Sequence, residues 1–267
     1  RNTLRFLIGA LDGFGEGERL DPAEMPELER WVLHRLAELD AQVREGYAAH
    51  DFQGVFQTLF NFATGDLSAF YFDVRKDALY CDAATATRRR ACRTVMDLLF
   101  HRLVTWLAPI LAFTMEEAWL CRFPGEESSV HLQDFPGTPA DWRDDDLAAK
   151  WARVREARRV VTGALEIARR DKVIGASLEA APVLYVADPD IAAAVRSVDM
   201  AELAITSELT VAEHTPPDEA FFQENPAIGV VFERADGEKC ARCWRILPDV
   251  GAHSRPGLCG RCDRALG

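Results

Sequence analysis

Residues Pro26 to His50 read PELERWVLHRLAELDAQVREGYAAH, and this stretch has a regular helical pattern. Its apolar residues recur at steps of three and four, which is the period of an α-helix with one buried stripe. The stripe consists of Leu28, Trp31, Val32, Leu36, Leu39, Val43 and Tyr47. The pattern predicts a long amphipathic helix.

Further helices are expected on the C-terminal side of this one. Asp51 has the side chain of an N-cap for the next helix, whose aromatic-rich stripe predicts a core-facing surface. That stripe consists of Phe52, Phe56, Leu59, Phe60, Ala63, Leu67, Phe70 and Val74. A third helix is interrupted by Pro109, and a fourth is expected from there to Phe123. Because short connections make neighbouring helices antiparallel, residues 20–123 predict an up-and-down bundle.

The helical pattern lapses between Pro124 and Asp146, where proline, glycine, serine and acidic residues indicate a linker. A basic helix is expected from about Leu147 to Asp171. Beyond that helix the sequence has short runs typical of strands, namely Val183–Val186, Leu203–Val211 and Gly229–Phe232. These runs predict a small unit with mixed α and β structure.

Four of the seven cysteines form two Cys-x-x-Cys pairs separated by 15 residues, and they are Cys240, Cys243, Cys259 and Cys262. This spacing is typical of a four-cysteine zinc site, and four protein ligands close the site to water and substrate. We therefore expect one structural Zn²⁺. Two disulfides or four free thiols are the alternative. His253 lies between the pairs and could replace a cysteine, although four sulfurs already suffice.

The sequence therefore predicts a mainly α protein in three parts. An antiparallel helical bundle is expected in residues 1–140. A junction domain, made of the basic helix and the small α+β unit, is expected in residues 141–225. A zinc-finger module is expected in residues 226–267.

The formal net charge of −12 excludes binding of nucleic acid by bulk charge. The charge is uneven, however, because Arg75–Arg93 has six basic residues against two acidic ones. Lys150–Lys172 has eight against three, and Glu238–Gly267 has six against three. Each segment also has the pattern of a solvated helix face or loop. Any contact with a polyanion must therefore be local.

Candidate nucleic-acid contacts fall in two of these segments. In the bundle, at the end of the second helix and the start of the third, they are Arg75, Lys76, Arg88, Arg89 and Arg90. In the finger they are Arg242, Trp244, Arg245 and Arg261. Guanidinium groups there can reach phosphates, and an indole can stack on an unpaired base. Trp244 could equally fill the small core of the module.

Signatures of catalysis are missing from the sequence. It has no glycine-rich phosphate loop, no Gly-x-Ser-x-Gly, and neither the His-x-Gly-His nor the Lys-Met-Ser-Lys-Ser motif of class I ligases. No apolar run reaches the roughly 18 residues of a membrane span, and no signal peptide is recognisable. The chain begins without Met inside a helical pattern, so we expect a part of a larger cytoplasmic protein.

Several stretches resemble one family, and they include RNTLRFL (1–7), DLSAFYFDVRKDALY (66–80), LAPILAFTMEEAW (107–119), SVHLQDFP (129–136), KVIGASLEA (172–180), KCARCW (239–244) and CGRC (259–262). Together they resemble the C-terminal part of bacterial isoleucyl-tRNA synthetases. The helical stretches are shared in looser form with valyl and leucyl relatives. The four-cysteine module is the part that points to the isoleucyl family.

The resemblance implies a class I ligase that attaches isoleucine to its tRNA with ATP. It implies that the bundle is the anticodon-binding domain and that this fragment binds the anticodon arm of isoleucine tRNA. The catalytic and editing domains of the same polypeptide would lie upstream of Arg1. The fragment itself is then expected to be an inactive monomer with no membrane contact.

Two alternatives come from other functional classes. DNA glycosylases of the formamidopyrimidine type end in a similar four-cysteine finger, but they use an N-terminal proline and a helix-two-turn-helix. This chain starts with Arg1-Asn2 and continues into a long bundle. A zinc-stapled scaffold that binds only protein would instead have no affinity for any RNA.

Overall fold

A computed structural model describes residues 1–267 of the chain. The chain divides into two compact units, Arg1–Asp145 and Asp146–Gly267. The first unit is helical, and the second carries a long helix, a small mixed sheet and the four clustered cysteines. The mainly α class is therefore confirmed. The further division of the second unit into a junction domain and a finger stays a prediction.

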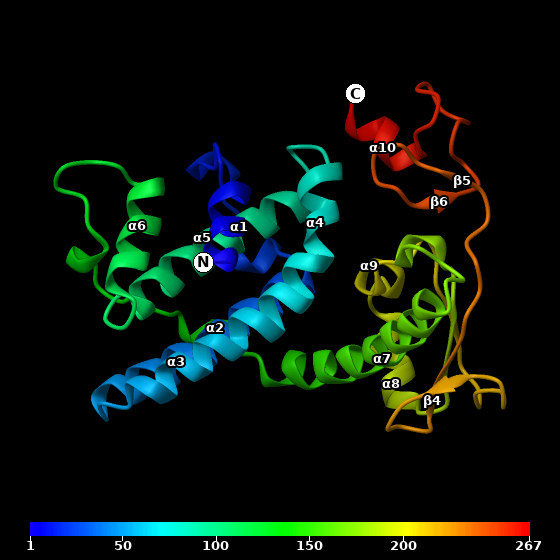
Figure 1. Cartoon of the computed structure of the whole chain (residues 1–267), viewed down its shortest axis with the longest axis horizontal. Helices are drawn as coiled ribbons and strands as arrows, with labels where there is room; N and C mark the ends of the chain where they lie inside the picture. The colour runs from blue at the N-terminus through cyan, green and yellow to red at the C-terminus, as the bar shows by residue number, and fades with distance from the viewer. The chain divides into compact units, whose positions relative to one another are not determined.

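The first unit is built almost entirely of helices (Figure 1). Its elements are α1 (Asn2–Ala10), η1 (Glu16–Glu18), η2 (Pro22–Glu24), α2 (Glu27–Ala48), α3 (Phe52–Asn61), η3 (Phe62–Tyr71), α4 (Phe72–Cys81), α5 (Thr87–Leu107), α6 (Ala112–Arg122), η4 (Val130–Leu132) and η5 (Ala140–Trp142). The expected N-cap is present, because the Asp51 carboxylate accepts a hydrogen bond of 2.9 Å from the Gly54 amide. The α3, η3 and α4 segments follow one another without a break and form one long helical stretch.

The core of the bundle lies on α2 and α5. The stripe predicted for α2 is buried from Leu28 to Val43, and only Tyr47 at its end is half-buried. The central α5 contributes Phe100 and Trp106, both fully buried. The Tyr47 hydroxyl donates a hydrogen bond to the Trp106 carbonyl, which joins the ends of the two helices.

The expectation that the α3 aromatics face the core is wrong for three of them. Phe52, Phe56 and Phe60 are exposed, while Val55 and Leu59 form the buried face of α3. Phe52, Phe56 and Phe60 follow one another at steps of four and lie on one side of α3, while Val55 and Leu59, each three residues beyond one of them, lie about 60° round the helix on the side that meets the core. From Phe62 onward η3 is wound as a π-helix, and Leu67, Phe70 and Val74 of the stripe are buried again.

The second unit begins in α7 (Asp145–Arg170) and then alternates short helices and strands. These elements are η6 (Ser177–Glu179), β1 (Val183–Val186), α8 (Pro189–Arg196), α9 (Met200–Ala204), β2 (Thr210–Ala212), β3 (Phe221–Phe222), β4 (Ile228–Val231), β5 (Glu238–Lys239), β6 (Ile246–Leu247) and α10 (Gly260–Ala265). The main sheet has the order β2-β1-β4-β3, in which β1 runs parallel to β2 and antiparallel to β4. A separate antiparallel pair, β5 and β6, opens the cysteine-containing segment.

The strand expected from Leu203 to Val211 is only partly correct. Its first residues belong to α9, because the Asp199 carboxylate caps that helix at the Glu202 amide. Ile205 then adopts a left-handed conformation with φ 59° and ends the helix. This is a strained conformation for a β-branched side chain, and β2 starts only at Thr210.

Candidate metal centre and nucleic-acid surface

The four cysteines of the two Cys-x-x-Cys pairs lie together in the second unit. Their sulfur atoms all lie within 4.8 Å of one another, and all four residues are buried. The Sγ atoms of Cys243 and Cys259 are 3.8 Å apart, and none of the four clustered cysteines forms a disulfide. A tetrahedral site with Zn–S bonds of about 2.3 Å separates its sulfurs by roughly 3.8 Å. The geometry therefore fits one Zn²⁺ and contradicts the disulfide alternative.

The protonation of the thiols also suits a metal. Burial opposes the Cys240 thiolate, but backbone hydrogen bonds from Cys243, Cys259 and Arg242 lower the pKa of Cys240 to about 6. Burial raises the pKa of Cys243, and it raises the pKa of Cys262 to about 11. A divalent cation supplies the charge that ionises such buried thiols, and protons leave as it binds.

The second cysteine turn is held by a carboxylate that sequence reasoning missed. The Asp249 carboxylate accepts a hydrogen bond of 2.8 Å from the Gly260 amide, next to Cys259. The same oxygen lies 2.9 Å from Nε2 of His253. His253 is therefore bound to Asp249 and is not part of the sulfur cluster, as the alternative of a histidine ligand would have required.

Ser207 connects the finger to the rest of the second unit. Its carbonyl accepts a hydrogen bond of 3.1 Å from Nε of Arg245 and a further one from Nη2. Its hydroxyl accepts one of 2.7 Å from the Ile246 amide and donates one to the Leu178 carbonyl. Arg245 was expected to face nucleic acid, but its guanidinium is held in this clamp.

Trp244 lies on the surface of the finger. Its side chain is 62% exposed, which contradicts the alternative that it fills the core of the module. Its φ of 66° is left-handed, and Nζ of Lys239 lies 5.7 Å from the ring centre. A pocket of about 230 Å³ beside the indole is lined by Lys239, Arg234 and Glu179 among others. The indole is thus accessible, and Lys239 lies next to its ring.

Arg75 is not a surface residue, and the prediction that it meets a phosphate is wrong. Nε and Nη2 of Arg75 each lie 2.6 Å from an oxygen of Glu29. The Tyr71 hydroxyl donates a further hydrogen bond of 3.1 Å to that carboxylate. Both charged side chains are buried in the bundle. The guanidinium therefore neutralises Glu29 inside the core and does not face solvent.

The other candidate contacts in the bundle are at least partly exposed, and they already have acceptors. Lys76 bonds to Asp73 at 2.6 Å, and Arg88 bonds to Asp82 at 2.8 Å. Arg89 donates to the Leu79 carbonyl at 3.2 Å. Arg90 donates to the carbonyls of Gly17 and Glu18. Their contact with nucleic acid remains a prediction, as it does for the half-buried Arg242 and Arg261.

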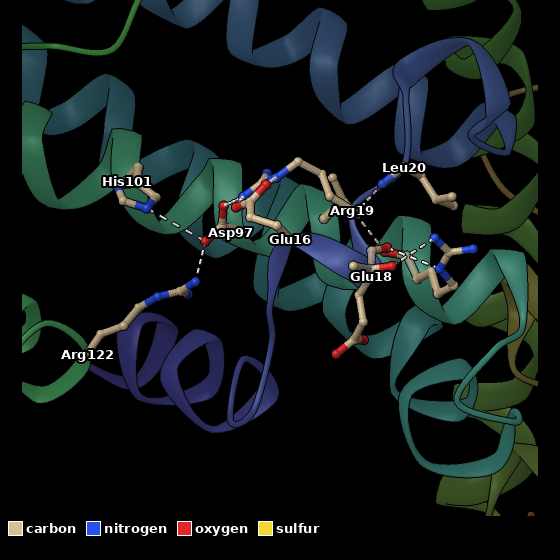
Figure 2. Close-up of polar contacts among 10 residues, drawn as sticks. Glu16, Glu18, Arg19, Leu20, Asp97, His101 and Arg122 are labelled. Carbon is tan, nitrogen blue, oxygen red and sulfur yellow. Dashed lines mark hydrogen bonds and ion pairs between the residues drawn. The ribbon is translucent and has the colours of Figure 1, made fainter.

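A second polar cluster, which sequence reasoning also missed, is centred on Asp97 of α5 (Figure 2). The buried Asp97 carboxylate lies 2.7 Å from Nη2 of Arg19, bonds to Arg122 and lies 3.6 Å from Nε2 of His101. Burial lowers the pKa of His101, against the attraction of Asp97. Two positive charges converge on one carboxylate, so the cluster fastens the segment before α2, through Arg19, and α6 to α5.

Comparison with known proteins bears on both sites. Residues 29–185 match the family model of the anticodon-binding domain of tRNA ligase. The chain belongs to this anticodon-binding domain family. Residues 237–265, which contain all four clustered cysteines, match a zinc finger found in FPG and IleRS. Since the anticodon-binding match covers more than half of the chain, the glycosylase alternative loses its support.

Relatives of this anticodon-binding protein are isoleucine-tRNA ligases. The ligase of Ruegeria pomeroyi is 66% identical over 269 residues, covering 100% of this chain and 28% of the relative. That of Agrobacterium fabrum is 53% identical over 268 residues, with the same coverage of both chains. That of Brucella abortus is 53% identical over 253 residues, covering 94% of this chain and 26% of the relative. The chain thus spans just over a quarter of the length of these ligases.

None of the helices combines the length and hydropathy that crossing a membrane requires.

Proposed function

We propose that this chain is the tRNA-reading part of an isoleucine-tRNA ligase and binds the anticodon arm of isoleucine tRNA. The observation that carries the proposal is the similarity of the whole chain to such a ligase, at 66% identity. The match to the anticodon-binding family and the finger match point the same way. The attachment of isoleucine with ATP then belongs to upstream catalytic and editing domains of the same cytoplasmic, monomeric protein.

The finger is proposed to contribute one stacking contact and two charges. The exposed Trp244 indole would stack on an unpaired base, since base stacking on aromatic side chains tolerates any base. Arg242 and Arg261, on the two cysteine turns, would meet phosphates. The Zn²⁺ held by the four cysteines fixes both turns and so orients these side chains. Arg245 would contribute to RNA binding only indirectly, because its hydrogen bonds to the Ser207 carbonyl hold the finger in place.

The bundle is proposed to contribute Lys76, Arg88, Arg89 and Arg90, which surround the turn between α4 and α5. Their number is small for a chain of net charge −12. If about four phosphates are neutralised in all, log K should fall against log salt with a slope of roughly −3 to −4. Such a slope is much shallower than that of a protein with a broad basic groove.

Binding of tRNA tests the proposal directly. Affinity of the purified chain is measured by filter binding for isoleucine tRNA, for an unrelated tRNA, and for isoleucine tRNA without its anticodon arm. We expect the intact isoleucine tRNA to bind best. Full-strength binding of the tRNA that lacks the arm would contradict the assignment, and absence of binding to every RNA would favour a scaffold that binds only protein. The chain alone should not exchange pyrophosphate into ATP with isoleucine.

A further inference from the structure

A groove lies in the first unit between α1 and the η3–α4 helix, away from the contacts described so far except Lys76. It consists of two adjoining hollows of about 270 Å³ and 420 Å³ that share Asn2, Phe6 and Tyr80. Their combined size is within the range of about 300–1,000 Å³ typical of ligand sites. Sequence reasoning did not identify this groove, because its residues come from segments about 70 positions apart.

The floor of the groove is flat and aromatic. The rings of Phe6 and Phe72 are stacked, with their centres 4.6 Å apart and their planes at 28°. Tyr80 lines both hollows and is 66% exposed. Gly9 also lines the groove, and the space beside it is open, because an added Cβ there would meet nothing within 4 Å. The exposed tyrosine ring is therefore accessible to a planar group in a groove that is largely aromatic.

The rim of the groove is positively charged. Arg5 is exposed, and its guanidinium has neither a hydrogen bond nor an ion pair. Lys76 is 48% exposed and bonds to Asp73, which is the one acidic residue that lines the hollows. A surface ion pair of this kind contributes at most about 1 kcal/mol and exchanges readily for another anion. In an acidic chain the groove thus offers two cations beside an aromatic face.

We propose that this groove binds one unpaired nucleotide of the tRNA, with its base stacked on Tyr80 and its phosphate between Arg5 and Lys76. The proposal rests on the proposed function, because it adds a third contact to the same RNA. Aromatic stacking combined with nearby cations is the usual way in which proteins hold single-stranded RNA. A peptide would need an acidic side chain next to a planar one to use both features, whereas every nucleotide carries a phosphate next to a base.

Three variants test the groove in the whole chain, with the affinity for isoleucine tRNA as the readout. Tyr80→Ala removes the stacking ring and should weaken binding about 5- to 150-fold. Tyr80→Phe keeps the ring and should bind like the unmodified chain. Arg5→Ala should weaken binding and flatten the salt slope by about one unit. Phe113→Ala serves as the matched control, because Phe113 on α6 is 94% exposed and lies outside the groove.

Circular dichroism shows for each variant that the bundle is folded. If the unmodified chain binds isoleucine tRNA and both Tyr80→Ala and Arg5→Ala bind equally well, the groove proposal is overturned while the proposed function stands. If the unmodified chain binds no tRNA, the proposed function fails. A titration with adenosine monophosphate, followed by the NMR signals of the Tyr80 ring, then decides the groove separately. Unmoved signals would overturn it.

Discussion

Glu29 and Arg75 form a buried ion pair across the bundle, with two N–O distances of 2.6 Å and exposed side-chain fractions of 0% and 4%. The pair joins α2 to α4. Tyr71 donates a hydrogen bond to the same carboxylate, so three polar groups satisfy one another inside an apolar core. Such a group is stable as a unit and sensitive to the loss of any one member.

Replacing Arg75 should therefore act on stability. Arg75→Ala leaves the Glu29 carboxylate buried without its counter-charge, and the free energy of unfolding should fall by about 3–5 kcal/mol. Tyr71→Phe removes the hydroxyl that donates to Glu29 and should lower the free energy of unfolding by about 1–2 kcal/mol. Urea denaturation measures both values. Lys76→Ala is the control, since it is a neighbouring surface cation and should stay within about 0.5 kcal/mol. An equally small effect of Arg75→Ala would contradict the core role.

Removing the metal should affect the two units differently. We expect one Zn²⁺ per chain, bound by Cys240, Cys243, Cys259 and Cys262. Chelation should unfold the finger, because so short a segment has little core of its own, while the bundle stays helical. Metal analysis and circular dichroism measure the two effects. A Cys243→Ser Cys262→Ser variant should contain no zinc, and an unchanged zinc content would exclude these ligands. Cys121→Ser, at an exposed cysteine of α6, is the matched control.

The role of Trp244 can be separated from that of its neighbours. Trp244→Ala should weaken binding of isoleucine tRNA by about 1–3 kcal/mol without changing the salt slope, because the indole meets a base. Arg242→Ala should flatten the slope by about one unit, because the guanidinium meets a phosphate. Zinc content and affinity are measured on the same sample. Retained zinc with unchanged affinity in Trp244→Ala would eliminate the stacking contact.

Acid should weaken the Asp97 cluster through His101. Burial lowers the pKa of His101 in the folded chain, so the unfolded chain binds more protons once the pH falls through the ordinary value of 6.5. The free energy of unfolding should therefore decrease on acidification through this window. Arg19, Arg102 and Arg122 add to the effect of burial, and Asp97 opposes it.

The matching variant is His101→Gln, which removes the titrating group. Urea denaturation at several pH values between 7 and 5 should show a smaller loss of stability for this variant than for the unmodified chain. Parallel losses in the two proteins would assign the acid sensitivity to other groups.

The sequence predicted those parts of the fold that depend on residues close together in the chain. The stripe of α2 and the spacing of the four cysteines each depend on steps of a few residues, and both are found as expected. The fate of Arg75 depends on Glu29, which lies 46 positions away, and a count of charges contains no information on such a partner. The exposure of Phe56 depends on which face of α3 meets α2. The hydrogen bonds of Arg245 go to the backbone carbonyl of Ser207. Every residue has such a carbonyl, so the sequence does not indicate which one Arg245 contacts.

The attachment of the finger through Ser207 separates two properties of the finger, its metal and its orientation. The same kind of finger occurs in FPG and IleRS, so it is not specific to one kind of protein. Here the finger is attached to the carbonyl and the hydroxyl of one residue, Ser207, which lies just after the strained Ile205 in the same unit. A finger transplanted without that attachment would keep its metal and lose its orientation. The orientation of the cysteine turns therefore depends on Ser207 as well as on the metal, although 32 residues lie between Ser207 and Cys240.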